Sequence, residues 1–286
     1  MTPGPYRLTL PDRRTTSVVF ASPHSGSYYP KEFLGRSVLG EKAIRSSEDA
    51  FVDRLLDPVP GFGAPLLTAV APRAFVDLNR AADELDPALI EGFRAPAHNP
   101  RVASGLGVVP RVVSGGRAIY AGKLPLHEVK ARISDWWHPY HDRLQILMDE
   151  SRLRFGQAIL IDMHSMPHEA LDAVTVPGRL RPEVVLGDRY GTSASAAIME
   201  AVDAAFARAG LRTVRNMPFA GAYIAQAYGR PARAQHVVQI EIDRSLYMNE
   251  AEVRPNGNFT GFQRILSGVL SEIAMIGRAE DRLAAE

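Results

Sequence analysis

The sequence predicts an α/β fold in which helices flank a central sheet. Short apolar runs alternate with longer amphipathic stretches along the 286 residues, and this alternation is typical of α/β proteins. Hydrophobic residues make up 46% of the chain and charged residues 23%, which suits a globular protein with a sizeable core. The sequence has no internal repeat, low-complexity tract or convincing linker, so we predict a single domain over residues 1–286.

The first third of the chain predicts three strands and one helix. Residues 17–21 (SVVFA) form an apolar run that ends at a Ser-Pro turn, which indicates a buried strand. Ser46 or Ser47 is suited to cap a helix whose apolar residues 51, 52, 55 and 56 face inward and which ends before Pro58. Two more apolar runs, 66–70 and 74–78, predict two further strands.

Residues 81–123 interrupt this pattern, because they are rich in Gly, Pro and Arg and show little periodicity. Long loops in compact domains tend to be lids or binding loops. A surface insertion without a role in the site is the alternative interpretation.

The rest of the chain returns to the alternation of helices and strands. Residues 126–155 have a helical pattern, with Pro139 at a break or a new start. Further helices are predicted at 193–209 and 262–285, and strands at 157–163, 183–186, 212–215 and 236–242. The strand at 157–163 (QAILIDM) brings Asp162 and His164 to its end.

Composition and charge exclude several classes of function. The formal net charge is +1, so nothing in the electrostatics indicates a nucleic-acid or membrane-surface partner. The N-terminus lacks the apolar segment of a signal peptide, and the apolar runs are far shorter than a membrane span, so we expect a cytoplasmic protein. There are no cysteines, and a bound metal must therefore use His, Asp or Glu.

Polar residues with reactive side chains follow the predicted strands. His24 follows the first strand, Asn79-Arg80 follows residues 74–78, His164 follows 157–163, and Glu241 lies within 236–242. Ligands of open α/β sheets bind in the crevice at the carboxyl ends of the strands. We therefore expect these residues to converge despite their separation in sequence.

His24 and His164 are the candidate metal ligands, because both follow an apolar strand and precede a turn. A single histidine in such a place is commonly bonded to backbone, but two in the same context favour ligation. Imidazole and carboxylate suit zinc, which typically takes three protein ligands in catalytic sites. Glu48 and Asp49 are both candidates for the third ligand, although each could equally serve as an acid at a helix N-terminus.

Glu241 is the candidate general base, because an ionised carboxylate between Ile240 and Ile242 is costly unless it has a partner. Strand alternation places it on one face with Gln239 and Asp243, which indicates the wall of a cleft. A buried salt bridge with an arginine is the alternative.

Arg80 is the candidate anchor for a substrate carboxylate, since a planar guanidinium can grip one with two hydrogen bonds. Its alternative is a structural pair with Asp77 or Asp83. Three more arginines in Gly/Pro contexts could also face the site: Arg111, Arg117 and Arg230. His138 and His141 lie three apart on a predicted helix and can either chelate a metal or be structural.

Eight segments in order resemble the N-formylglutamate amidohydrolase family. They are SPHSG, SEDAFVDRL, RAFVDLNR, PYH, DMHS, LGDRYGTS, PFAGAYIAQAYGRP and HVVQIEIDRSLYMNE, which lie between about Val18 and Glu250. The resemblance implies a mixed central sheet in a three-layer architecture related to zinc-dependent exopeptidases. This chain departs from the family at Gly221-Ala222, where two glycines are common, and matches least in residues 81–123.

The resemblance also implies a set of roles. One zinc ion per chain is held by His24, Asp49 and His164, and Asp49 is preferred to Glu48 because the family carries an aspartate there. Glu241 takes the role of general base, and Asn79 with Arg80 holds a carboxylate of the substrate. The implied reaction is hydrolysis of N-formyl-L-glutamate, a small molecule, to formate and L-glutamate.

Three other functions remain open from the sequence, and a fourth is disfavoured. The same scaffold could serve a carboxypeptidase or a broader N-acyl amino-acid deacylase. A binuclear ureohydrolase-like enzyme is disfavoured, because such enzymes use a DxHxD cluster and Met166 stands at its last position. A non-catalytic protein that binds an amino-acid derivative has no need of a general base.

Overall fold

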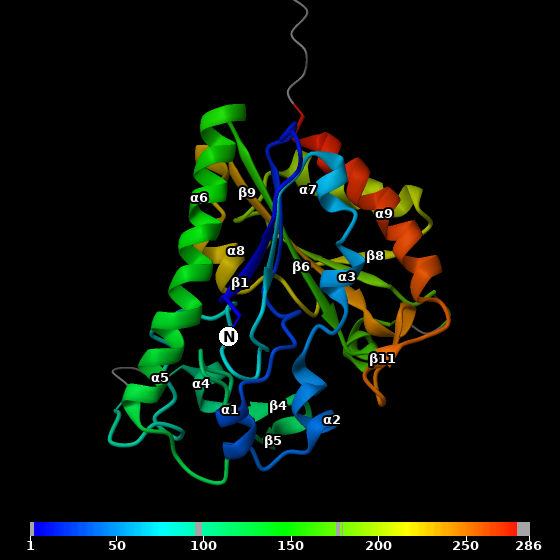
Figure 1. The fold of residues 1–286 in the computed structure, drawn as a ribbon. Coiled ribbons are helices and arrows are strands. Elements are labelled where there is room, and N and C mark those ends of the chain that lie inside the picture. The colour runs from blue at the N-terminus through cyan, green and yellow to red at the C-terminus, as the bar shows by residue number, and fades with distance from the viewer. Residues whose placement is uncertain (1–2, 95–98, 176–177, 179, 279–286) are drawn as a thin grey trace, which may run out of the picture.

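The centre of the protein is a mixed sheet of seven strands (Figure 1). The computed structural model describes residues 3–94, 99–175, 178 and 180–278. In spatial order the strands are β1 (Tyr6–Thr9), β3 (Leu66–Ala69), β2 (Val18–Ser22), β6 (Ala158–Met166), β9 (Gln235–Asp243), β7 (Val184–Gly187) and β8 (Thr213–Arg215). Strands β3, β2, β6 and β9 are parallel, whereas β1 and β7 pair antiparallel with β3 and β9.

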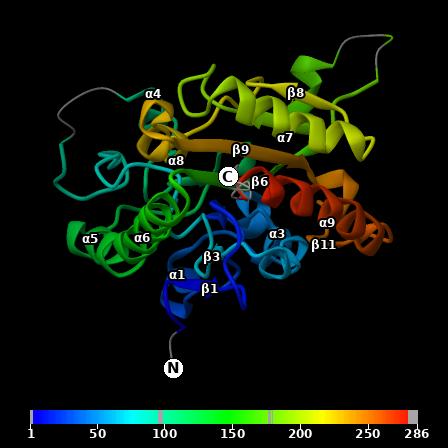
Figure 2. The ribbon, with the colours of Figure 1, turned by 90° about the horizontal axis from the view of Figure 1, so that it is seen from above.

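Helices cover both faces of the sheet, which confirms the predicted arrangement of a mixed sheet flanked by helices (Figure 2). One face carries α3 (Val52–Leu55), α7 (Ala196–Arg208) and α9 (Phe259–Ile276), and the other carries α5 (Leu126–Arg132), α6 (His138–Phe155) and α8 (Tyr223–Tyr228). Alternate side chains of β2 enter the two cores: Val18 and Phe20 on the first face, Val19 and Ala21 on the second.

Shorter elements lie in the connections. They are α1 (Lys31–Arg36), α2 (Glu41–Ile44), α4 (Pro100–Ala103), β4 (Val112–Val113), β5 (Arg117–Ala118), β10 (Met248–Asn249) and β11 (Arg254–Pro255). The elements α1, α2, α4, β4 and β5 gather beyond the carboxyl end of the central parallel strands, at the bottom of Figure 1. No helix of the described residues is long and apolar enough to cross a membrane.

The apolar core on the α6 side ends halfway along the two central strands. Leu160 of β6 and Val237 of β9 pack in that core, but the next side chains on the same face are Asp162 and Gln239. All of these residues are buried. The polar half of this face therefore provides the side chains of a site at the carboxyl ends of β6 and β9.

Two predictions for the first third of the chain are wrong. Residues 74–78 form turns rather than a strand: the amides of Phe75 and Val76 bond back to the carbonyl of Pro72, although both side chains are buried. The helix expected from Ser46 or Ser47 begins only at Val52, because Phe51 before it has a left-handed φ of 67°.

Other boundaries differ by a few residues. Helices α5 and α6 join through a π-helical turn, Ile133–Trp137, and Pro139 occupies the first turn of α6, as expected for a new start. Helix α7 is capped by Ser195, whose Oγ accepts from the amide of Ile198, and α9 begins at Phe259. Residues 279–285 of the last predicted helix lie outside the described residues. Strand β1 was not predicted from the sequence.

Candidate metal centre and active site

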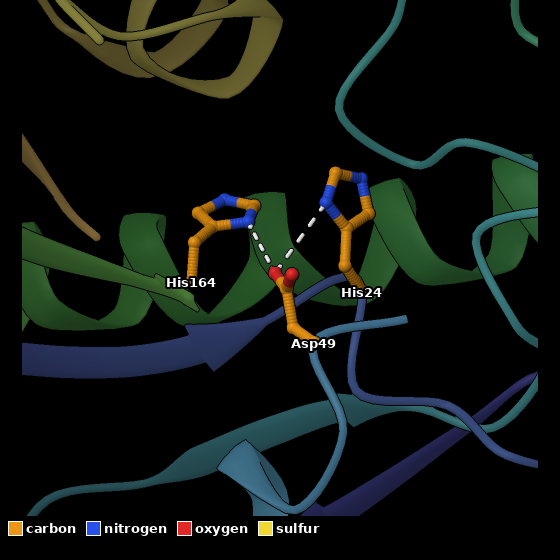
Figure 3. Close-up of side chains that lie close together, drawn as sticks. All are labelled: His24, Asp49 and His164. Atoms are coloured by element: carbon orange, nitrogen blue, oxygen red, sulfur yellow. Dashed lines mark hydrogen bonds and ion pairs between the residues drawn. The ribbon is translucent and has the colours of Figure 1, made fainter. Parts of the chain in front are cut away.

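Two histidines and an aspartate from three distant segments meet at the carboxyl end of the sheet (Figure 3). His24 follows β2, His164 lies near the end of β6, and Asp49 lies in the turn before α3. Their potential ligand atoms all lie within 4.8 Å of one another, and all three residues are buried. The Oδ2 atom of Asp49 is 2.9 Å from His164 Nδ1 and 3.7 Å from His24 Nδ1.

The opposite nitrogen of each ring has its own carboxylate partner. His24 Nε2 is 2.7 Å from Asp77 Oδ1, and His164 Nε2 is 3.1 Å from Asp162 Oδ2. Carboxylates in this position orient histidine rings that bind metals through their other nitrogen. The buried Nδ1 of His24 has no hydrogen-bond partner, which is the condition expected of a ligand atom. The donor set and its orientation therefore fit a metal ion.

The electrostatics of the centre favour a positive charge between the ligands. Burial lowers the pKa of His24 to about 4, so its ring is neutral near pH 7 and Nδ1 keeps its lone pair. Burial opposes a charge on His164, but the carboxylate of Asp162 raises the pKa of that ring well above its usual value. The same local excess of negative charge stabilises either a proton on His164 or a metal ion beside it.

Asp49, not Glu48, lies with the histidines. Its second oxygen, Oδ1, accepts a hydrogen bond of 3.0 Å from Arg244 Nη2, which sets the orientation of the carboxylate. Glu48 instead accepts two bonds of 2.9 Å from Arg45 and one of 3.0 Å from the hydroxyl of Tyr29. Glu48 therefore has a structural role in this arrangement.

Glu241 lies beside the metal-ligand cluster on the neighbouring strand. The register of β6 and β9 pairs it with His164, and Gln239 Nε2 donates a bond of 2.8 Å to its Oε1. Burial raises the pKa of Glu241 to about 7, close to the value that suits a general base at neutral pH. Within the described residues no arginine forms an ion pair with it, contrary to the salt-bridge alternative.

Asn79 and Arg80 also lie at the site, but they differ in how their side chains are used. The Asn79 amide bonds within the protein: Oδ1 accepts from the amide of Ile224 (2.8 Å) and Nδ2 is 3.2 Å from His164 Nε2. Arg80 lines the cavity, and its Nε and Nη1 donate to the carbonyls of Leu106 and Asn79. Neither of the two expected acids pairs with Arg80: Asp77 pairs with His24 and Arg73, and Asp83 forms no ion pair within the described residues.

Helix α6 and the π-helical turn before it hold the backbone on both sides of Asn79. Trp137 Nε1 donates to the carbonyl of Arg80, and His141 Nε2 donates to the carbonyl of Leu78, each at 2.9 Å. The other nitrogen of His141 is 2.9 Å from the hydroxyl of Tyr228. His141 is therefore a structural histidine, one of the two alternatives drawn from the sequence.

The other three arginines lie elsewhere. Arg111 pairs with Asp86 at 2.9 Å, Arg117 is exposed and donates to the carbonyl of Ser114, and Arg230 is exposed beside β9. None of the three is among the residues that line the cavity. A Gly/Pro context indicates a loop but does not show where the side chains of that loop point. It therefore does not predict which arginines line the cavity.

Sequence reasoning missed several residues at the site. Arg73, whose Nε donates to Asp77 Oδ2 at 2.9 Å, lines the cavity together with Arg101. Arg244 and the roles of Asp77 and Asp162 were also missed. Asp162 could have been found, since it lies two residues before His164 and therefore on the same face of the strand.

The cavity at the site has two lobes. The polar lobe, of about 380 Å³, contains the metal-ligand cluster, and a second lobe of about 320 Å³ adjoins it. Four residues line both lobes: Arg73, Ser165, Phe219 and Glu241. Glu241 thus lies at the junction of the two lobes.

Comparisons with known proteins agree with the resemblance found in the sequence. The chain is 29% identical over 245 residues to N-formylglutamate deformylase of Pseudomonas aeruginosa, covering 83% of this chain and 84% of that protein. It is 29% identical to the enzyme of the same name from Pseudomonas putida, covering 82% and 83%.

Solved structures extend this agreement to the fold. The crystal structure of N-formylglutamate amidohydrolase from Ralstonia eutropha JMP134 matches with a TM-score of 0.89 and 34% identity, covering 96% of this chain and 99% of that one. Gene product Atu2144 from Agrobacterium tumefaciens shares the fold at a TM-score of 0.64 and 17% identity, covering 96% of both chains. The model of the N-formylglutamate amidohydrolase family matches residues 16–248, which is most of the sequence. With this match and the buried His–Asp–His centre, the chain belongs to the N-formylglutamate amidohydrolase family.

Proposed function

We propose that the protein hydrolyses the amide bond of an N-formyl amino acid, with N-formyl-L-glutamate as the first candidate and formate and L-glutamate as products. The observation that carries this proposal is the position of Glu241, which lines the same cavity as His24, Asp49 and His164. The names of the Pseudomonas relatives support the choice of substrate.

We assign one zinc ion per chain to His24, Asp49 and His164. Two imidazole nitrogens and a carboxylate oxygen are a common ligand set of catalytic zinc. When bound, zinc supplies a Lewis acid for the amide carbonyl and lowers the pKa of a water molecule. The proposed Nδ1 ligation leaves each Nε2 with its aspartate, Asp77 or Asp162.

Glu241 moves the proton in this mechanism. Its carboxylate accepts a proton from the water that attacks the formyl carbon and then gives it to the nitrogen of the leaving amino group, so that the C–N bond breaks as the amine becomes neutral. Gln239 holds one carboxylate oxygen in place. Arg73 lies at the junction of the lobes and faces the negative charge that develops on the carbonyl oxygen.

Arg80 holds a carboxylate of the substrate. Two nitrogens of its guanidinium are fixed by backbone carbonyls, so the group is rigid before the substrate arrives. Since the Asn79 amide is used within the protein, we assign Asn79 the positioning of His164 and Gln239 rather than a grip on the substrate. Arg101 lines the same lobe and is suited to the second carboxylate of glutamate.

The direct test is formate release from N-formyl-L-glutamate by the purified protein. We expect turnover that a chelator abolishes and that added Zn²⁺ restores. Glu241→Gln should lose activity by at least about a thousandfold while zinc content stays near one per chain. Wild-type turnover by this variant would exclude Glu241 as the base.

A matched pair of variants tests the third ligand. Asp49→Asn should lower the zinc content of the purified protein, whereas Glu48→Gln should keep it, because Glu48 bonds to Arg45 and Tyr29. Elemental analysis by mass spectrometry measures both. If the protein binds zinc but releases formate from no N-formyl amino acid, the proposed deformylation is wrong and a binding role is favoured.

A further inference from the structure

The second lobe of the cavity differs in character from the lobe that contains the metal-ligand cluster. At about 320 Å³ it falls within the size range of small-molecule pockets. Much of its wall is apolar, and we call it the apolar lobe. The apolar residues of the wall are Leu106, Pro110, Val112, Val113, Met166 and Pro167. Such a wall favours a hydrocarbon group over a charged one.

The charges in the two lobes indicate which part of a substrate each receives. The two arginines that line the apolar lobe already bind carboxylates: Arg73, which also lines the polar lobe, pairs with Asp77 at 2.9 Å, and Arg244 pairs with Asp49 at 3.0 Å. In the polar lobe, Arg80 bonds only to backbone carbonyls among the described residues. The carboxylates of an amino acid are therefore best held in the polar lobe.

Glu241 lines both lobes, so a carbonyl beside it lies at their junction. An amide whose amino-acid half lies in the polar lobe and whose carbonyl lies beside Glu241 directs its acyl half into the apolar lobe. A formyl group has only a hydrogen atom beyond its carbonyl carbon and leaves this lobe unfilled.

We propose that the protein also hydrolyses N-alkanoyl amino acids, with an unbranched acyl chain of about three to six carbons lying in the apolar lobe. This inference rests on the proposed amide hydrolysis and extends its substrate class. The reaction adds water across the C–N bond and releases an alkanoic acid and the free amino acid, so no further reactant is needed.

The first experiment compares N-acetyl-, N-butanoyl- and N-hexanoyl-L-glutamate with the zinc-loaded protein. We expect kcat/KM to rise along this series by up to about fourfold per added methylene, since each one leaves water for an apolar wall. The alkanoyl substrates are compared with one another because a formyl carbonyl is intrinsically more reactive. A steady fall from acetyl to hexanoyl, with N-formyl-L-glutamate turned over, would overturn the inference while leaving the proposed function intact.

The second experiment fills the lobe. Ser114, between β4 and β5, lines it, is partly exposed and forms no side-chain hydrogen bond within the described residues. Ser114→Phe should lower the ratio of kcat/KM for N-hexanoyl- to N-formyl-L-glutamate at least tenfold, and Ser114→Ala should leave the ratio within about twofold. An unchanged ratio in the Phe variant contradicts the inference, and so does a selective loss on N-formyl-L-norleucine, which would place the amino-acid side chain in the lobe.

Calorimetric binding to the Glu241→Gln variant gives a readout that does not depend on turnover. N-hexanoyl-L-glutamate should bind more tightly than N-formyl-L-glutamate, and Ser114→Phe in the same background should remove the difference. Equal affinities overturn the inference. If the wild-type protein fails to hydrolyse N-formyl-L-glutamate, the proposed function fails, and this measurement still decides what the lobe binds.

Discussion

Acidification should weaken the fold through His141, a buried histidine that holds the backbone beside the site. Both of its ring nitrogens are bonded, Nε2 to the carbonyl of Leu78 and Nδ1 to the hydroxyl of Tyr228. Burial lowers the pKa of His141 from 6.5 to about 4. The folded protein therefore keeps this ring neutral at pH values where the unfolded chain protonates it.

The size of the effect follows from these two pKa values. The unfolded state binds more protons between pH 6.5 and about pH 4, so the free energy of unfolding falls as the pH decreases through this range. The stabilisation is complete above pH 6.5. At about pH 5 the loss from this one residue amounts to about 2 kcal/mol, a substantial part of the stability of an ordinary domain.

Urea unfolding at about pH 7.5 and about pH 5, at one zinc concentration, measures the loss. His141→Gln is the comparison, because a glutamine amide can still donate to the Leu78 carbonyl but carries no charge in this range. The pH-dependent loss should be smaller in the variant by about 2 kcal/mol, since the other histidines contribute equally to both proteins. Equal losses in the two proteins would refute the assignment of His141 as the acid-sensitive group.

Three further changes test the surroundings of the centre. Asp162→Asn should weaken zinc binding by about 10- to 100-fold in competition with a chelating dye, and an unchanged affinity would show that this carboxylate does not orient His164. Trp137→Phe removes the donor to the Arg80 carbonyl, and this loss should raise KM for N-formyl-L-glutamate about fivefold with little change in kcat. A fall in kcat alone would argue against a role of Trp137 in positioning Arg80. Gly26→Ala would place its Cβ 2.1 Å from a backbone oxygen and should lower the unfolding free energy by about 2 kcal/mol in denaturant titrations, whereas Gly35→Ala, with open space around it, should not destabilise the protein.

The sequence predicted helices and strands correctly where the pattern of apolar residues fitted only one kind of element. The central strands β6 and β9 are apolar runs of the expected length, and the structure has both. Residues 74–78 are equally apolar, but Pro72 begins a turn whose bonds are local, and burial alone does not distinguish a strand from a buried turn. Strand β1 pairs at the edge with half-buried residues, so its apolar signal is weak.

The site was predicted in part, for a physical reason. His24 and His164 follow from the rule that strand ends converge, which depends only on topology. The choice of Asp49 over Glu48 came from the family resemblance, because two neighbouring acids look alike in the sequence and only the folded turn shows which of them lies with the histidines. The partners of Arg73 and Arg111 depend on contacts between distant segments, and no local pattern encodes them.

The pairing of His164 with Glu241 across two central strands divides the site into a half held by the sheet and a half held by loops. The β6–β9 ladder joins nine residue pairs in the middle of the sheet, so these two groups move apart only when the whole sheet opens. Asp49 and most residues of the apolar lobe lie in turns and short elements outside that ladder. The molecule can therefore change its acyl preference by replacing loops while the distance between base and ligand stays constant, which makes this scaffold suited to diversification by loop exchange.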